Sequence, residues 1–186
     1  MVRSLLKGSL AGGALLFIWG MVSWMALPWH DAVIGKVARE DLFTAVLEEA
    51  APASGVYLYP NHGGEKMTSE QKKAAWDKMA SGPMVFMSVK KSGVTGMGGA
   101  MILSFLIQAV TALLMTLLLA QAPGLGLAGR VLFGGLAMLM GGLSIHGSQW
   151  NWFCFPDGYT LVAIVDGALS GALAGLAAHW ALRRPA

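Results

Sequence analysis

The sequence predicts an all-α membrane protein with four transmembrane helices and a small α+β extracytoplasmic cap between the first two helices. The chain has 186 residues, of which 55% are hydrophobic and only 12% are charged, whereas about a quarter of the residues in a soluble domain are charged. Charged residues are scarce in four long apolar runs, and a membrane-spanning helix needs about 20 such residues. Between the first and second runs lies a polar segment with the periodicity of short helices and strands.

The first apolar run covers residues 8–29 and contains LAGGALLFIWGMVSWMALPW. Arg3 and Lys7 precede it, and a secretory signal would also begin with positive charge followed by an apolar stretch. The run is long, however, and it ends in LPWHDAV rather than in a clear small-residue cleavage site. We therefore expect an uncleaved first transmembrane helix.

The sequence pattern of residues 30–95 predicts a cap whose elements follow the order helix, strand, helix, strand. HDAVIGKVAREDLFTAVLEEAAP repeats apolar residues near helical spacing until Pro52, and SGVYLYP and PMVFMSVKK predict the strands. MTSEQKKAAWDKMASG predicts the second helix, with Thr68 and Gln71 in capping-box positions and Gly82 just past its end. Because so few residues bury too little surface to be comfortably stable alone, we expect the cap to pack on the outer ends of the helices.

The remaining apolar runs predict the second, third and fourth transmembrane helices at residues 96–120, 131–147 and 160–182. The third run is short, so it must use flanking residues or thin the bilayer locally. Between the third and fourth helices, residues 148–159 contain QWNWFCFPDGY. The Pro-Asp-Gly sequence within it is typical of a turn, and we expect an outer aromatic turn there.

Aromatic rings are expected at the outer boundary of the membrane, because amphipathic rings prefer that interface. The candidate interface residues are Trp24, Trp29, Trp150, Trp152 and Phe155. The same rings could instead line a pocket for a quinone, a pigment or a lipid. Cys154 lies among them and is the only cysteine; it excludes an intramolecular disulfide, and we expect an inert apolar thiol.

Basic residues beside the helices predict how the chain is threaded through the membrane. They precede the first helix, lie between the second and third, and follow the fourth, in regions without acidic residues: Arg3, Lys7, Arg130, Arg183 and Arg184. The positive-inside rule places these regions in the cytoplasm. Lys90 and Lys91 argue the other way, but they belong to a longer loop in which acidic and basic residues balance. Both termini are then cytoplasmic, and residues 30–95 are extracytoplasmic.

Glycines give the fourth helix one smooth face. Gly167, Gly171 and Gly175 follow one another at intervals of four residues, which brings them to the same side of a helix. In lipid there is little hydrophobic force between helices, so close backbone approach drives their association. The smooth face either packs within the bundle or docks a partner chain, and the sequence leaves both interpretations open.

Polar side chains within membrane helices are costly, so each one is a functional hypothesis. The candidates for a ligand or metal site are His30, His146, Asp166 and Gln108, which a bundle could gather in the outer leaflet. Two imidazoles and a carboxylate could bind a metal, a histidine and an aspartate could relay a proton, or the groups could only fix the bundle by hydrogen bonds. HExxH, HxH and CxxC motifs are absent, so the spacing does not choose among these interpretations.

The sequence shows no catalytic motif, and we assign no catalytic residue. A GxSxG nucleophile elbow is absent, and HGGEK around His62 lacks the spacing of a phosphate loop. His179 is expected as an interfacial residue at the inner end of the fourth helix. No Arg-rich stripe with interleaved aromatics indicates nucleic acid. The identity of any cofactor stays open.

Three segments, FIWGMVSWMALPWH, SGVYLYPN and WNWFCFP, together resemble a family of small bacterial four-helix inner-membrane proteins. The resemblance spans most of the chain, and it implies four helices and an outer cap but no catalytic residue. We expect a non-catalytic protein of the bacterial inner membrane, in contact with the lipid bilayer and with other subunits or a second copy. Its expected role is that of an accessory or assembly subunit. The alternative is binding or transport of a small ligand, a metal or a proton by the outer-leaflet His/Asp cluster.

Overall fold

The computed structural model describes residues 2–61, 66–94 and 96–183. The chain divides into two compact units. The helical unit comprises Met1–Gly35, Gly96–Asn151 and Phe155–Ala186, and the cap unit comprises Lys36–Thr95 with Trp152–Cys154. Each unit is described separately below.

In the described part of the chain, four helical stretches are long and apolar enough to cross a membrane: Val2–Ala26, Met97–Ala120, Leu127–Phe153 and Asp157–Leu182. The fold class predicted from the sequence is therefore confirmed. The first stretch is α1 (Val2–Met21) followed by a π-helical turn, and the second is α5 (Met97–Ala120). The third joins α6 (Leu127–Gly142), a second π-helical turn and α7 (Ser148–Phe153), and the fourth is α8 (Asp157–Leu182).

Several helix boundaries differ from the sequence expectation, and α8 also begins at Asp157 rather than at residue 160. The first helix ends at Ala26 rather than near residue 29, because Leu27 has an extended backbone before Pro28, as the residue preceding a proline usually does. The chain then forms the short helix α2 (Trp29–Val33). The third stretch extends beyond residues 131–147 in both directions, and it takes up residues 148–153, which the sequence assigned to a turn.

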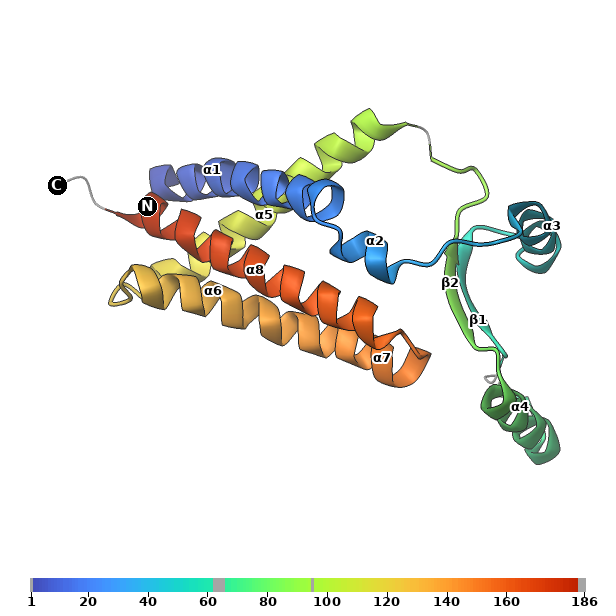
Figure 1. The fold of residues 1–186 in the computed structure, drawn as a ribbon. Coiled ribbons are helices and arrows are strands. Elements are labelled where there is room, and N and C mark those ends of the chain that lie inside the picture. The colour runs from blue at the N-terminus through green and yellow to red at the C-terminus, as the bar shows by residue number, and fades with distance from the viewer. Residues whose placement is uncertain (1, 62–65, 95, 184–186) are drawn as a thin grey trace. The chain divides into compact units, whose positions relative to one another are not determined.

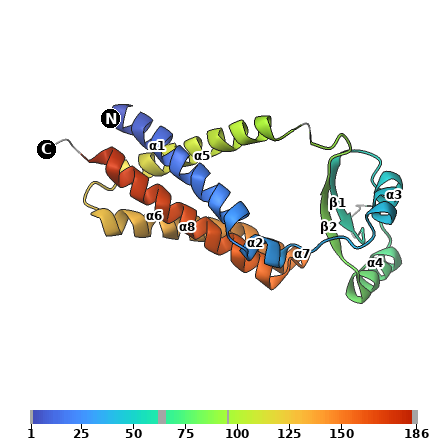
Figure 2. The ribbon, with the colours of Figure 1, turned by 45° about the horizontal axis from the view of Figure 1, so that its top comes forward.

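The helices of the helical unit associate in pairs. In Figures 1 and 2, α6 and α8 run side by side in opposite directions, α1 crosses α5, and the start of α1 lies at the same end of the unit as the end of α8. The core lies where α1, α5 and α8 meet, and its buried members are Leu16, Ala112, Met115, Leu119, Ala174 and Ala178. The first part of α5 extends away from the other helices (Figures 1 and 2), and residues 97–107 are exposed except for the half-buried Phe105.

Glycines bring α6 and α8 into backbone contact. A Cβ added to Gly171 would collide with the carbonyl oxygen of Gly134, and one added to Gly175 would collide with the carbonyl oxygen of Arg130. A Cβ added to Gly167 would have no atom within 4 Å. Two of the three glycines on the smooth face therefore lie against a helix of the same chain, where close approach maximises dispersion contacts.

The cap unit has the element order that the sequence predicts, and its elements are α3 (Glu40–Ala50), β1 (Gly55–Tyr59), α4 (Ser69–Ser81) and β2 (Val85–Val89). The strands are antiparallel, with Gly55 opposite Val89 and Tyr59 opposite Val85. The Thr68 hydroxyl accepts from the Gln71 amide at 3.2 Å, and the Gln71 side chain accepts from the Thr68 amide at 2.9 Å. This confirms the predicted capping box.

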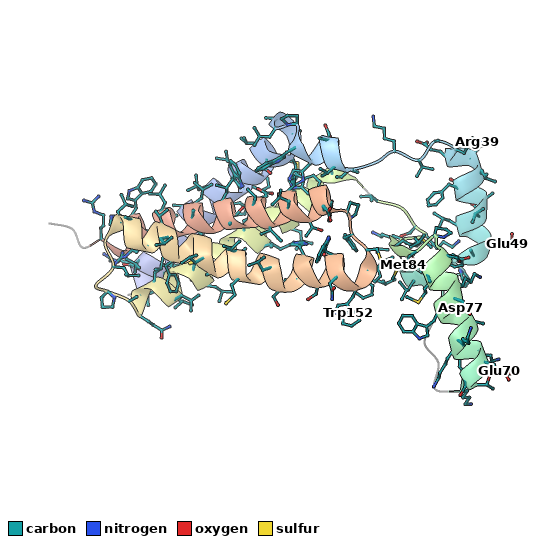
Figure 3. All side chains as sticks on the ribbon, turned by 60° about the horizontal axis from the view of Figure 1, so that its bottom comes forward. Arg39, Glu49, Glu70, Asp77, Met84 and Trp152 are labelled. Atoms are coloured by element: carbon teal, nitrogen blue, oxygen red, sulfur yellow. The ribbon has the colours of Figure 1, made fainter. Side chains whose placement is uncertain are left out.

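Residues 152–154 belong to the cap unit although they follow α6 in the chain. The Phe153 ring stacks on Phe86 of β2 with centroids 4.5 Å apart, and the Cys154 sulfur lies 3.6 Å from that of Met84. Figure 3 labels Met84 and Trp152 in this region. Cys154 is a free and exposed thiol with a positive φ of 55°, a backbone region that is uncommon for residues other than glycine.

Candidate functional site

A cavity of about 320 Å³ lies within the helical unit. Its lining comes from α1 and the π-helical turn after it, from α2, α5 and α6, from the second π-helical turn, and from α8. The structure brings together all four polar residues that the sequence singled out, because His30, Gln108, His146 and Asp166 each line this cavity. They come from four different helical segments.

His30 and Asp166 lie next to each other in the lining of the cavity. The His30 Nε2 atom lies 3.4 Å from the Asp166 Oδ2 atom and 3.1 Å from the Ser23 hydroxyl. His30 is only 4% exposed, and the Asp166 side chain is 17% exposed. The Ser23 hydroxyl can donate to Nε2 or accept from it, according to the tautomer of the imidazole.

Trp19 holds the other oxygen of the same carboxylate. Its indole Nε1 donates to the Asp166 Oδ1 atom at 2.8 Å, across a sequence separation of 147 residues. An indole N–H can only donate, so the Oδ1 atom of Asp166 accepts this hydrogen bond. This arrangement offsets the high cost of placing an aspartate in a membrane helix. Trp19 was not among the sequence candidates, because nothing local marks a tryptophan on α1 as the partner of a carboxylate on α8.

Aromatic rings enclose His30 on two sides. Trp24 stacks on the imidazole with centroids 3.9 Å apart and an interplanar angle of 8°, and Trp29 approaches it edge-on at 5.7 Å. Trp29 also donates from Nε1 to the Ser23 carbonyl oxygen at 2.9 Å. These two tryptophans, expected at the membrane interface, thus orient the His30 ring, while Trp24 keeps 53% of its surface exposed.

The other aromatic candidates lie apart from the cavity. Trp150 donates from Nε1 to the Asp157 carboxylate at 2.6 Å, which ties the end of α6–α7 to the start of α8. Trp152 is 69% exposed. Phe155 is tilted against Tyr159 with ring centroids 5.6 Å apart, and Tyr159 itself lines the cavity.

Two π-helical turns supply cavity residues. The turn Val22–Ala26 carries Trp24, and the turn Leu143–Gly147 carries His146. Such turns are rare and often occur at functional sites, because the inserted residue re-aims the side chains around it. The His146 Nδ1 atom lies 3.1 Å from the Gln149 amide oxygen. With the Gln149 amide oxygen as acceptor, Nδ1 is the donor of this hydrogen bond.

The charge of the lining restricts what the cavity can bind. Its ionisable members are Asp166, His30, His146 and Tyr159, and neither lysine nor arginine lines it. The Asp166 carboxylate is an acceptor in this lining and suits a ligand with hydrogen-bond donors. Within the described residues, no group of three or more His, Cys, Asp or Glu side chains is placed to hold a metal ion.

The remaining sequence candidates lie in three places. Gly167 and Gly171 line the cavity, and Gly175 packs against α6. His179 lies thirteen residues beyond Asp166 on α8, which is about 20 Å at the helical rise. His62 falls outside the described residues.

No family model, no curated protein and no solved structure matches the chain. The resemblance to small bacterial four-helix membrane proteins therefore leads to no identified family. Four long apolar helices support a small four-span membrane protein, and any function beyond that must be argued from the cavity.

Proposed function

We propose that this integral membrane protein binds a small ligand carrying hydrogen-bond donors, with a small protonated amine as the best match, in the His30–Asp166 cavity. The observation that carries the proposal is the convergence of His30, Gln108, His146 and Asp166 on one cavity from separate helical segments. A volume of about 320 Å³ is at the lower end of small-molecule sites, which are mostly apolar with a few placed polar groups.

The charge distribution favours an amine over an acid. Asp166 supplies a carboxylate, the described lining contains neither lysine nor arginine, and the Trp24 and Tyr159 rings also line the cavity. A cation gains from a carboxylate and from aromatic faces in a medium of low dielectric constant. An anion would meet the Asp166 charge without a fixed positive charge to offset it.

The basic residues at one end of the helical unit support a proposed location and orientation for the protein. The start of α1 and the end of α8 lie at one end of the helical unit (Figure 1), and the neighbouring segments contain Arg3, Lys7 and Arg130 but no acidic residue. By the positive-inside rule this end faces the cytoplasm, in our proposal that of a bacterial inner membrane. The cavity then lies in the outer half of the bilayer, and residues 30–95 are extracytoplasmic.

The role of an accessory or assembly subunit stays a prediction. Its main support in the sequence was a glycine face free to dock a partner. Gly171 and Gly175 lie against α6 of the same chain, so that argument now rests on Gly167 alone. Gly167 lines the cavity and faces open space, which makes it a tool for testing the ligand proposal.

The test combines purification with cavity-filling variants. The full chain is purified in gentle detergent, co-eluting small molecules are identified by mass spectrometry, and methylammonium is titrated while tryptophan fluorescence is recorded. Trp19 and Trp24 contact the Asp166–His30 pair, so their emission should report binding. We expect Gly167→Leu to abolish the response by filling the cavity, and Gly167→Ala to retain it.

Two results would contradict the proposal. One is an unchanged response in Gly167→Leu, since the site could not then be this cavity. The other is purification of the chain with stoichiometric partner proteins, no co-eluting small molecule and no response to methylammonium. That result would support the accessory-subunit hypothesis instead.

A further inference from the structure

Two buried side-chain nitrogen atoms at the opposite end of the helical unit have no hydrogen-bond partner among the described residues. Arg130 on α6 is only 8% exposed, and its Nε atom is shielded from solvent without a hydrogen bond. The Nδ1 atom of His179 on α8 is in the same state. Gly175 packs against the Arg130 carbonyl oxygen, and His179 follows Gly175 by about one helical turn. The two groups therefore lie on facing helices at neighbouring levels.

Within the described part of the helical unit, no acidic side chain forms an ion pair with Arg130. The acidic residues in the segments of the helical unit are Asp31, Asp157 and Asp166. Asp157 begins α8, Asp166 accepts from Trp19, and Asp31 lies on α2 beside His30. A buried arginine without a counter-ion is costly, so an anion bound beside Arg130 would stabilise the folded chain.

The start of α6 adds donors at the same place. The helix begins at Leu127, and the preceding Gly126 provides no side-chain cap. The Arg130 amide donates to the Gly126 carbonyl oxygen at 3.0 Å, so the amides before it are the first-turn donors that an α-helix leaves without intrahelical partners. Such amides and the positive end of the helix dipole favour a bound anion, whereas a cation at this position is unfavourable by itself.

The surroundings indicate a lipid as the source of the anion. Leu127 and Leu132 on α6 and Trp180 on α8 are 47%, 61% and 58% exposed, and they belong to helices long and apolar enough to cross a membrane. Acyl chains can cover such side chains, while a phosphate group at the helix ends meets the guanidinium. A guanidinium binds phosphate through paired, charge-assisted hydrogen bonds.

We propose that Arg130, His179 and the first turn of α6 bind the phosphate of an anionic phospholipid, in the leaflet at the end of the unit that carries both termini. The inference is independent of the ligand proposed for the His30–Asp166 cavity, because the sites share no residue. It assigns Arg130 a counter-ion that the bilayer supplies.

The test uses the full chain in nanodiscs of phosphatidylcholine with or without phosphatidylglycerol. Native mass spectrometry counts the phosphatidylglycerol retained after delipidation, and thermal unfolding measures the stabilisation that it gives. We expect Arg130→Gln and His179→Gln to weaken retention, by about tenfold for Arg130, as loss of a charge-assisted hydrogen bond implies. Arg183→Gln is the matched control, because Arg183 is exposed at the same end; it should retain the lipid.

His179→Gln keeps the proposal testable if Arg130→Gln fails to fold, since it leaves the buried charge in place. The proposal is overturned if His179→Gln and a folded Arg130→Gln retain the lipid as the unchanged chain does. It is also overturned if Arg183→Gln loses the lipid equally, because general surface charge would then suffice. Inorganic phosphate added to the chain in uncharged detergent tests whether free phosphate is the bound anion. If free phosphate raises the unfolding temperature as much as phosphatidylglycerol does, the lipid assignment is overturned.

Discussion

Asp166 and Asp157 are two carboxylates on one helix, and each accepts a hydrogen bond from a tryptophan indole. They differ in environment, because Asp166 is half-buried and paired with His30, whereas Asp157 is exposed. This difference makes the two residues a matched pair for experiments on the cavity.

We expect Asp166→Asn to abolish the fluorescence response to methylammonium, because it removes the only carboxylate in the cavity lining. The amide oxygen can still accept from Trp19, so the fold should survive. Asp157→Asn is the control and should leave the response unchanged. Equal responses in both variants would mean that the Asp166 charge is not part of the binding site.

The substitution Trp19→Phe separates the contribution of the indole hydrogen bond from that of the aromatic ring. The substitution keeps an aromatic side chain and leaves the Asp166 Oδ1 atom without its donor. An unsatisfied buried acceptor costs about 1–3 kcal/mol, and we expect the free energy of unfolding to fall by that amount in a denaturant titration in bicelles. Trp180→Phe, at a residue that is 58% exposed, should change it much less.

Asp41 in the cap unit gives a prediction on pH. The Arg39 side chain, followed by the Leu42 amide, lowers the pKa of Asp41 below its ordinary value. A lowered pKa in the folded state means that the contribution to stability is present above the unfolded-state pKa and is lost as the pH falls through the folded value. We expect Arg39→Ala to raise the Asp41 pKa in an NMR titration. An unmoved pKa would assign the effect to the backbone amide.

At the scale of the elements, close packing of α6 on α8 depends on individual glycines. We expect Gly171→Ala to lower the free energy of unfolding by about 1–3 kcal/mol, the usual cost of overpacking, because its Cβ would meet the Gly134 carbonyl oxygen. Gly167→Ala should be nearly neutral, because its Cβ would enter open space. Thermal unfolding with size-exclusion chromatography measures both, and equal loss at both positions would contradict the packing argument.

Interruptions of regular helix place the cavity residues. Pro28 ends the first span, and α2 then sets His30 against Ser23 of the preceding π-helical turn. A continuous α-helix through Trp29 would carry His30 onward along the axis, about 10 Å beyond Ser23 at the helical rise. The break at Leu27–Pro28 is thus what brings the imidazole back to the cavity.

At the scale of the whole molecule, the single cysteine provides a direct test of topology. Cys154 is exposed and is predicted to be extracytoplasmic. We expect a membrane-impermeant maleimide to label it in cells whose inner membrane is intact. In a Cys154→Ala background, Arg183→Cys should be labelled only after the inner membrane is permeabilised. The reverse pattern would invert the orientation and place the cavity in the inner half of the bilayer.

The four spans, the order of elements in the cap and the capping box of α4 could be predicted from the sequence, because hydropathy and capping depend on residues close together in the chain. The sequence also nominated His30, Gln108, His146 and Asp166, since any polar group in an apolar run is conspicuous. Only the tertiary structure decided that these four residues line one cavity and that Trp19 donates to Asp166. It also decided that the Arg130 Nε atom has no hydrogen-bond partner among the described residues. Most of the surface of a membrane-spanning helix is apolar, so hydrophobicity does not reveal which helix faces pack together. Close backbone packing and interruptions of the helices determine which helices are in contact.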